Sequence, residues 1–319
     1  MKLRGLSFAL LILALQAVPR HCDAYETDQL TNRLNPIADS TAVLDEQVNL
    51  SIAEAVAEWK GRRNDWKVVT AIYNDIGGRH WVDKIERWAM KSDDVERLQP
   101  SRYDSIYRGH PLWATRVAAL FGVGPTIKVN NQLIGSDKLG HFLSQGRKFY
   151  RRYLKYLDEA KAAEHSAYTE RALFGQSTTG VYSNADLVAN YEGFRFYRSL
   201  FEDDVIPGKV AILHWTGEDW EIQREFTWAD HVNEYWDEAL NVNHFDNLLY
   251  PHMKERMEQF CPDYYQAPDA WNIENEASLQ ERYKDLQLRD TAELRLSNLC
   301  VAPVESDSYS TTVPAGQAN

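Results

Sequence analysis

The spacing of apolar residues predicts a mainly helical protein. Apolar positions three and four apart trace the buried stripe of an amphipathic helix. The clearest stripe covers residues 136–162, with Ser136 at the position of an N-cap, and residues 185–201 repeat the pattern. Further helices are expected at residues 50–59, 81–90, 112–121, 228–240, 247–260 and 279–296.

One region, residues 209–227, changes to the alternation of β-strands. Two apolar segments flank the polar residues 216–219, so this region predicts a hairpin with one solvated face. The expected fold class is therefore mainly α, with one helical domain over residues 49–301 that contains one small β-hairpin.

The N-terminal end has the layout of a secretory signal. Lys2 and Arg4 precede an apolar run over residues 6–18, and a short polar segment ends at Ala24. The run is 13 residues long, whereas a transmembrane helix needs roughly 20. We therefore expect residues 1–24 to be a cleaved signal peptide, and the mature protein to be periplasmic or secreted.

Two further segments are not expected to be helical. Residues 25–48 are polar and irregular and predict an extended N-terminal arm. Residues 302–319 are rich in Ser, Thr, Pro, Ala and Gly and predict a disordered tail.

The charge of the chain limits its partners. The formal net charge is −12, and removing residues 1–24, with three basic residues and one acidic residue, makes it −14. Because such a chain repels phosphate groups at long range, nucleic acid is not an expected partner. We expect an envelope component or a protein partner instead, and no transmembrane span in the mature chain.

Two cysteines remain after the signal, Cys261 and Cys300. An even number in an exported chain favours a disulfide. The alternative is two unpaired buried thiols. Their spacing is not that of a zinc site.

Two polar stripes interrupt the apolar pattern of the two clearest helices. Asp137 and His141 are four residues apart on the first, and Asp186 and Asn190 are four apart on the second. Residues at this spacing share one helical face. Because a buried carboxylate needs a partner, Lys138 or His141 is expected to meet Asp186, giving a polar site between two helices.

These two stretches resemble the paired motif of the VanZ-like proteins and of small periplasmic proteins with the same Asp-Lys-x-x-His element. The matching residues lie within about residues 135–195 and are Asp137, Lys138, His141 and Phe142, then Ser183, Asp186, Leu187, Asn190 and Gly193. VanZ-like proteins are integral membrane proteins, whereas these helices carry arginines and lysines that lipid would exclude. The resemblance therefore implies a shared polar site and no more.

Other polar residues give weaker indications. His231 and Glu234 have the spacing of metal ligands on a helix, although a solvated helix face explains the same acidic cluster more simply. The full cluster comprises Asp230, His231, Glu234, Asp237, Glu238 and His244. His110 has no assigned role. The cationic residues Arg147, Lys148, Arg151, Arg152 and Lys155 would hold an anion or, more simply, pair with neighbouring carboxylates.

Two functional hypotheses follow. The first is an exported hydrolase, with or without a divalent metal, acting on a lipid or cell-wall component. His141 would be the general base or a ligand, Asp137 and Asp186 would assist it or complete the ligand set, and Lys138 and Asn190 would hold a developing anion. The second is a non-catalytic envelope protein in which the same network stabilises the core.

Overall fold

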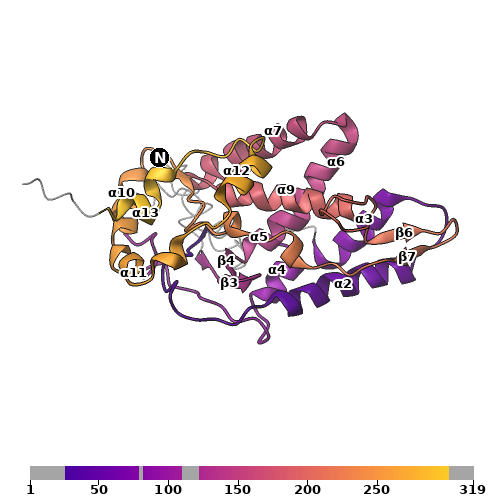
Figure 1. The fold of residues 1–319 in the computed structure, drawn as a ribbon, viewed down its shortest axis with the longest axis horizontal. Coiled ribbons are helices and arrows are strands. Elements are labelled where there is room, and N and C mark those ends of the chain that lie inside the picture. The colour runs from indigo at the N-terminus through magenta and orange to yellow at the C-terminus, as the bar shows by residue number, and fades with distance from the viewer. Residues whose placement is uncertain (1–25, 79–81, 110–121, 302–319) are drawn as a thin grey trace, which may run out of the picture.

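The computed structural model describes residues 26–78, 82–109 and 122–301, and most of its regular structure is helical (Figure 1). The mainly α fold class is confirmed. The helices are α2 (Thr41–Ala57), α3 (Asp65–Ile76), α4 (Lys84–Ala89), α5 (Asp137–Gly140), the π-helix η2 (His141–Gln145), α6 (Gly146–Tyr156), α7 (Glu159–Thr169), the π-helix η3 (Glu170–Phe174), α8 (Gln176–Thr179), α9 (Asn184–Ser199), α10 (Tyr250–Glu258), α11 (Cys261–Gln266), α12 (Glu276–Tyr283) and α13 (Leu296–Leu299). Among the described residues, no helix is both long enough and apolar enough to cross a bilayer.

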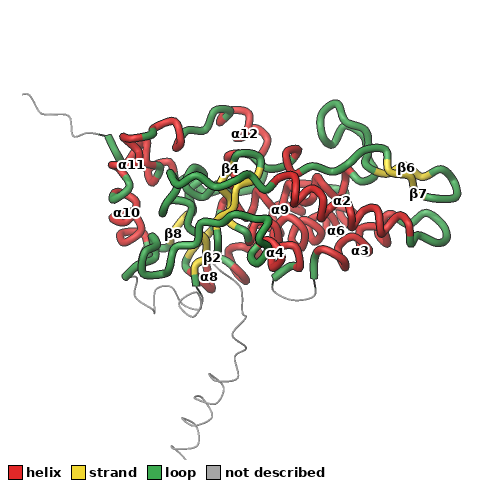
Figure 2. Tube along the Cα trace, turned by 90° about the horizontal axis from the view of Figure 1, so that it is seen from below, coloured by secondary structure: helices red, strands yellow, loops and turns green. Residues whose placement is uncertain are grey.

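The strands are short and form two-stranded sheets (Figure 2). The pairs are β1 (Glu26–Thr27) with β2 (Val123–Gly124), β3 (Thr126–Val129) with β4 (Gln132–Gly135), β5 (Val181–Tyr182) with β8 (His244–Phe245), and β6 (Leu213–Trp215) with β7 (Trp220–Ile222). The hairpin expected at residues 209–227 is the pair β6–β7. The hairpin β3–β4 was not expected; its turn residues Asn130 and Asn131 both have positive φ, as a tight hairpin turn requires.

Two expectations about helix length are wrong. Helix α2 begins at Thr41, with Leu44 and Val48 already buried, so the extended arm does not reach residue 48. The helix expected over residues 136–162 is several segments. It ends at Tyr156 because Leu157 adopts the left-handed conformation, and the side chain of Asp158 caps the start of α7.

The helices expected at residues 228–240 and 279–296 are also wrong. Only 3₁₀ turns occur in the first region, Trp228–Asp230 and Glu234–Trp236. Side chains of Thr227, Asn233 and Asp237 accept hydrogen bonds from nearby backbone N–H groups there, which competes with helix formation. In the second, α12 ends at Tyr283. Residues 1–24, 112–121 and 302–319 lie outside the described residues.

The two helices that carry the polar stripes are in backbone contact. A Cβ on Gly146 would lie 2.6 Å from the Gly193 backbone, and a Cβ on Gly193 would overlap the carbonyl oxygen of Phe142. Only glycine at these positions lets α9 approach η2 and α6 this closely. The ring of Phe142 packs beside this crossing against Phe196 and Trp228.

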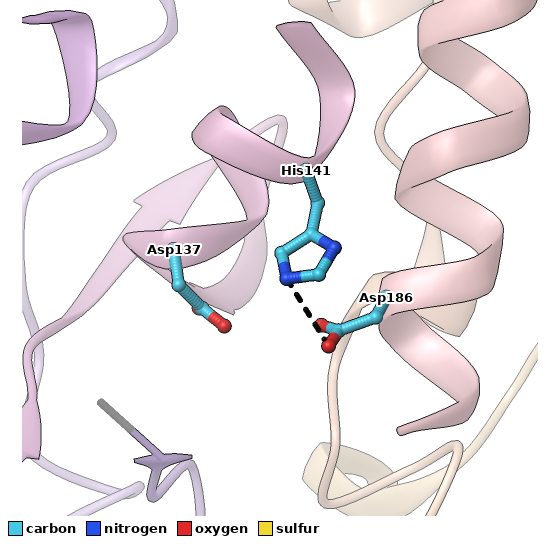
Figure 3. A group of neighbouring side chains, drawn as sticks. All are labelled: Asp137, His141 and Asp186. Atoms are coloured by element: carbon cyan, nitrogen blue, oxygen red, sulfur yellow. Dashed lines mark ion pairs between the residues drawn. The ribbon is translucent and has the colours of Figure 1, made fainter. Parts of the chain in front are cut away.

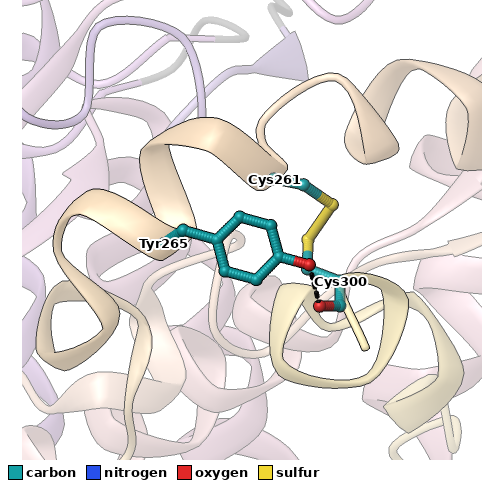
Figure 4. The surroundings of a disulfide bond; sticks show 3 residues. All are labelled: Cys261, Tyr265 and Cys300. Atoms are coloured by element: carbon teal, nitrogen blue, oxygen red, sulfur yellow. Dashed lines mark hydrogen bonds between the residues drawn. A yellow bond between two sulfur atoms is a disulfide. The ribbon is translucent and has the colours of Figure 1, made fainter. Parts of the chain in front are cut away.

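The buried apolar residues form two main clusters. The larger one gathers side chains from α2, α3, η2, α6 and α9, and the smaller one includes Leu240, Met253 and Met257 near the C-terminal helices. The expected disulfide joins Cys261 and Cys300 beside the smaller cluster (Figure 4). The hydroxyl of Tyr265 donates to the backbone carbonyl of Cys300, so the bridge is fixed between α11 and α13.

Candidate metal centre

The polar residues of the two stripes meet between α5, η2 and the first turn of α9 (Figure 3). One ligand atom each from Asp137, His141 and Asp186 lies within 4.8 Å of the others. His141 Nε2 is 3.2 Å from Asp186 Oδ2, and the three side chains are 17, 22 and 12% exposed. The predicted meeting of the two stripes therefore occurs, and a ligand can reach it from solvent.

Lys138 is the buried centre of this group. Its ammonium lies 2.8 Å from Asp137, 2.7 Å from Asp186 and 2.7 Å from Glu238, and its side chain is 1% exposed. Burial alone would lower the pKa of Lys138, but the three carboxylates raise it well above its usual value. Lys138 therefore holds the carboxylates in place, and is not available to bind a developing anion as we expected.

Asn190 orients His141. Its side-chain oxygen lies 3.1 Å from His141 Nδ1, and its amide nitrogen donates to Ser166 Oγ at 3.0 Å. Because the oxygen of Asn190 accepts, Nδ1 of His141 donates to it, and Nε2 faces Asp186. Asn190 thus fixes the orientation of the His141 ring, and its role as an anion-binding group stays a prediction.

Glu238 links this site to the rest of the fold. It accepts hydrogen bonds from Ser183 Oγ at 2.9 Å and Thr27 Oγ1 at 3.1 Å in addition to its ion pair with Lys138. Sequence reasoning placed Glu238 in a different cluster, on a helix that does not form. Glu238 lies 100 positions after Lys138, so no local sequence pattern predicts that the two residues are in contact.

Two further acidic residues near the site were missed. Burial and the nearby Glu238 raise the pKa of Glu26 to about 8, and burial with Asp186 raises the pKa of Glu170 well above its usual value. The backbone N–H of Ser183 donates to Glu170 at 3.1 Å. Glu26 is therefore mostly protonated at neutral pH. Glu26 lies in a strand of two residues, so its sequence surroundings gave no signal.

The Asp230–His244 cluster does not form a site, and both interpretations of it are wrong. His231 is 2% exposed and its Nδ1 lies 3.1 Å from Glu192, which also binds Arg195. Burial raises the pKa of Glu192, but Arg195 and His231 outweigh it, so the pKa is lowered overall. Asp237 is buried against Arg33 at 2.7 Å. The cluster is therefore neither a solvated face nor a metal centre but a source of separate buried ion pairs.

One oxygen at the site has no partner within the described residues. Asp137 Oδ1 is buried and makes no hydrogen bond, which leaves an acceptor available in a group where three carboxylates share one ammonium. His110 lies outside the described residues.

Comparisons with known proteins add no relative. The chain matches no family model, no curated protein and no solved structure.

Proposed function

We propose that this protein is an exported, divalent-cation-dependent hydrolase in which Asp137, His141 and Asp186 are the ligands. The observation that carries the proposal is the approach of these three ligand atoms, from α5, η2 and α9, at a partly exposed position. Within residues 26–78, 82–109 and 122–301, no other group of three histidine, cysteine, aspartate or glutamate residues is placed to hold an ion.

The spacing of the donor atoms of His141 and Asp186 fits a small ion. Two ligand atoms about 2.1 Å from one ion lie about 3.0–3.4 Å apart at ordinary ligand angles. His141 Nε2 and Asp186 Oδ2 are 3.2 Å apart. A proton or a cation between these two atoms would satisfy both of them. A histidine with two carboxylates suits zinc, manganese or iron(II).

The chain's own residues supply the rest of the chemistry. A bound ion would lower the pKa of a coordinated water and so provide a nucleophile at neutral pH. Asn190 holds the His141 ring, and Lys138 fixes the carboxylates of Asp137 and Asp186. The signal-like N-terminus supports a substrate in the cell envelope, such as a lipid or a cell-wall component.

The burial of Lys138 favours a second candidate function. A lysine that is 1% exposed and bound by three carboxylates is typical of a structural network, so the protein would then be a non-catalytic envelope protein. The two proposals differ in what they expect of His141. If the network is structural, removing His141 should destabilise the fold. If the residues form a metal centre, removing His141 should change stability little or even raise it, because functional residues are often not optimal for stability.

Metal binding tests the proposal directly. We expect zinc or manganese(II) to raise the melting temperature of the chelator-treated protein by several degrees, because the ion binds only the folded state. His141→Ala and Asp186→Asn should abolish this shift, and His214→Ala, at an exposed position of strand β6, should retain it. Differential scanning calorimetry and metal analysis give the measurement.

Two results would contradict the proposal. One is an unchanged melting temperature with every divalent ion. The other is a metal-free His141→Ala protein that unfolds several degrees below the wild type, which would favour the structural network instead.

A further inference from the structure

Large apolar side chains are exposed where the consecutive helices α6 and α7 are joined. The two helices meet at the edge of the molecule (Figure 1). At this end, large apolar side chains are exposed: Leu154 by 44%, Tyr156 by 37% and Leu157 by 77%. We call residues 151–157 the α6 tip.

Basic residues share the α6 tip with these apolar side chains. Arg151, Leu154 and Lys155 are three and four positions apart, so they are neighbours on one helical face. Lys155 lies 4.8 Å above the ring of Tyr156. A helix with basic and large apolar side chains next to each other is typical of segments that lie at a membrane surface.

The positive charge of the α6 tip is not neutralised within the described residues. Arg151, Arg152 and Lys155 form no ion pair with a carboxylate there, contrary to the simpler of our two expectations for the cationic residues. Burial and the neighbouring Arg151 lower the pKa of Arg152, the opposite of the effect of an ion pair.

The two acidic residues that follow the α6 tip in sequence have their own cationic partners. Asp158 lies 3.7 Å from Lys161, and Glu159 lies 2.7 Å from Arg198. They therefore do not cancel the charge of the tip.

Leu157 has a backbone conformation and an exposure that are unusual for a leucine at a helix end. Its φ of 52° lies in the left-handed region, where glycine is the usual residue at a helix C-terminus. A leucine there is strained, and its side chain gains almost nothing from the fold because it is 77% exposed. The position thus presents an apolar side chain outward although glycine would suit the backbone better.

We propose that the α6 tip binds the surface of an anionic phospholipid bilayer. The arginines and lysine would contact lipid phosphates while Leu154 and Leu157 enter the boundary of the acyl chains. The net charge of −12 does not prevent binding to an anionic bilayer. Salt screens charges beyond roughly 8 Å, so the local positive charge of the α6 tip determines its interaction with the lipid phosphates. The inference does not rest on the metal centre.

Vesicle flotation tests this binding in a buffer with a chelator, so that metal plays no part. We expect the mature chain to bind vesicles of equal parts phosphatidylcholine and phosphatidylglycerol, and not vesicles of phosphatidylcholine alone. Leu157→Gly should weaken binding about tenfold while melting at or above the wild-type temperature, because glycine relieves the strained backbone. Arg151→Glu with Lys155→Glu should abolish binding.

Matched substitutions on other surfaces serve as controls. Leu50→Ser, at a position 58% exposed on α2, and Arg62→Glu, in the exposed loop after α2, should bind vesicles as the wild type does. No binding of the wild type to the anionic vesicles would overturn the proposal. An equal loss of vesicle binding in the control variants, or equal binding of the wild type to neutral vesicles, would also overturn it. A change of oligomeric state in Leu157→Gly would show that the α6 tip joins two copies of the chain instead, and would overturn the proposal as well.

Discussion

Neighbouring residues on one helical turn have different roles in the candidate metal centre. The side chain of Lys138 is 1% exposed and satisfies three carboxylates, whereas that of His141, three positions later, is 22% exposed and is held by one amide. Burial thus separates a residue that organises the site from one that an ion can reach. Sequence spacing identified both residues but not this division of roles.

Asp83 provides a prediction about pH at this scale. Its carboxylate accepts from Ser144 Oγ at 2.8 and 2.7 Å, and burial raises its pKa to about 7. A carboxyl group with a folded-state pKa above its unfolded value stabilises the fold fully at low pH, and that stability is lost as pH rises from about 4 to 7. Asp83→Asn should therefore become more stable relative to the wild type over this range, by a few kcal/mol.

Urea unfolding at several pH values measures this difference. Asp75→Asn, at an exposed position on α3 without such a burial cost, is the control. Parallel stability curves for the wild type and Asp83→Asn would contradict the assignment.

At the scale of elements, the crossing of α9 over η2 and α6 sets the width of the site. His141 begins η2 and Asp186 lies in the first turn of α9, so the distance between these helices fixes the distance between the two side chains. The π-helix at this point is itself a feature often found at functional sites. The sequence predicted both helices, and it indicated a glycine at the end of the second stripe, but not that Gly146 and Gly193 touch.

Gly193→Ala tests this dependence. The added methyl group overlaps the carbonyl of Phe142, so α9 must move away, at a cost of about 1–3 kcal/mol or more. The shift also separates His141 from Asp186, and we expect the affinity for zinc to fall at least tenfold. Calorimetric titration with zinc and thermal unfolding measure the two effects. Gly193→Val should be worse in both, and an alanine variant with unchanged stability would show that the helices are not in close contact.

At the scale of the whole molecule, the ion pairs of Lys138 join regions with separate apolar cores. Leu139, next to Lys138, belongs to the larger cluster, and Ala239, next to Glu238, belongs to the smaller one. The 2.7 Å contact between Lys138 and Glu238 therefore fixes one part of the core relative to the other.

Lys138→Met should destabilise the whole protein. Three carboxylates would lose their common counter-ion, and breaking a buried ion pair costs about 3–5 kcal/mol. Lys161→Met removes an exposed ion pair of α7 and should cost at most about 1 kcal/mol. Denaturant unfolding compares the two variants. Equal effects from both would mean that the Lys138 contacts do not hold the fold together.

The sequence by itself determined the features that depend on local spacing. It predicted a mainly helical fold, the hairpin β6–β7, the helix α9, the pairing of Cys261 with Cys300, and the approach of Asp137 and His141 to Asp186. These succeeded because residues four apart share a helical face and because few cysteines leave few pairings. Export by residues 1–24 stays a prediction.

Only the tertiary structure decided the partners that come from distant parts of the chain. Glu26, Glu170 and Glu238 surround the site, and His231 pairs with Glu192 instead of a metal. None of these contacts follows from a periodic spacing of residues along the sequence, because each depends on how separate elements pack. Residues 228–240 form short turns in which side chains bind nearby backbone N–H groups, while Asp237 and His231 bind distant residues of the chain.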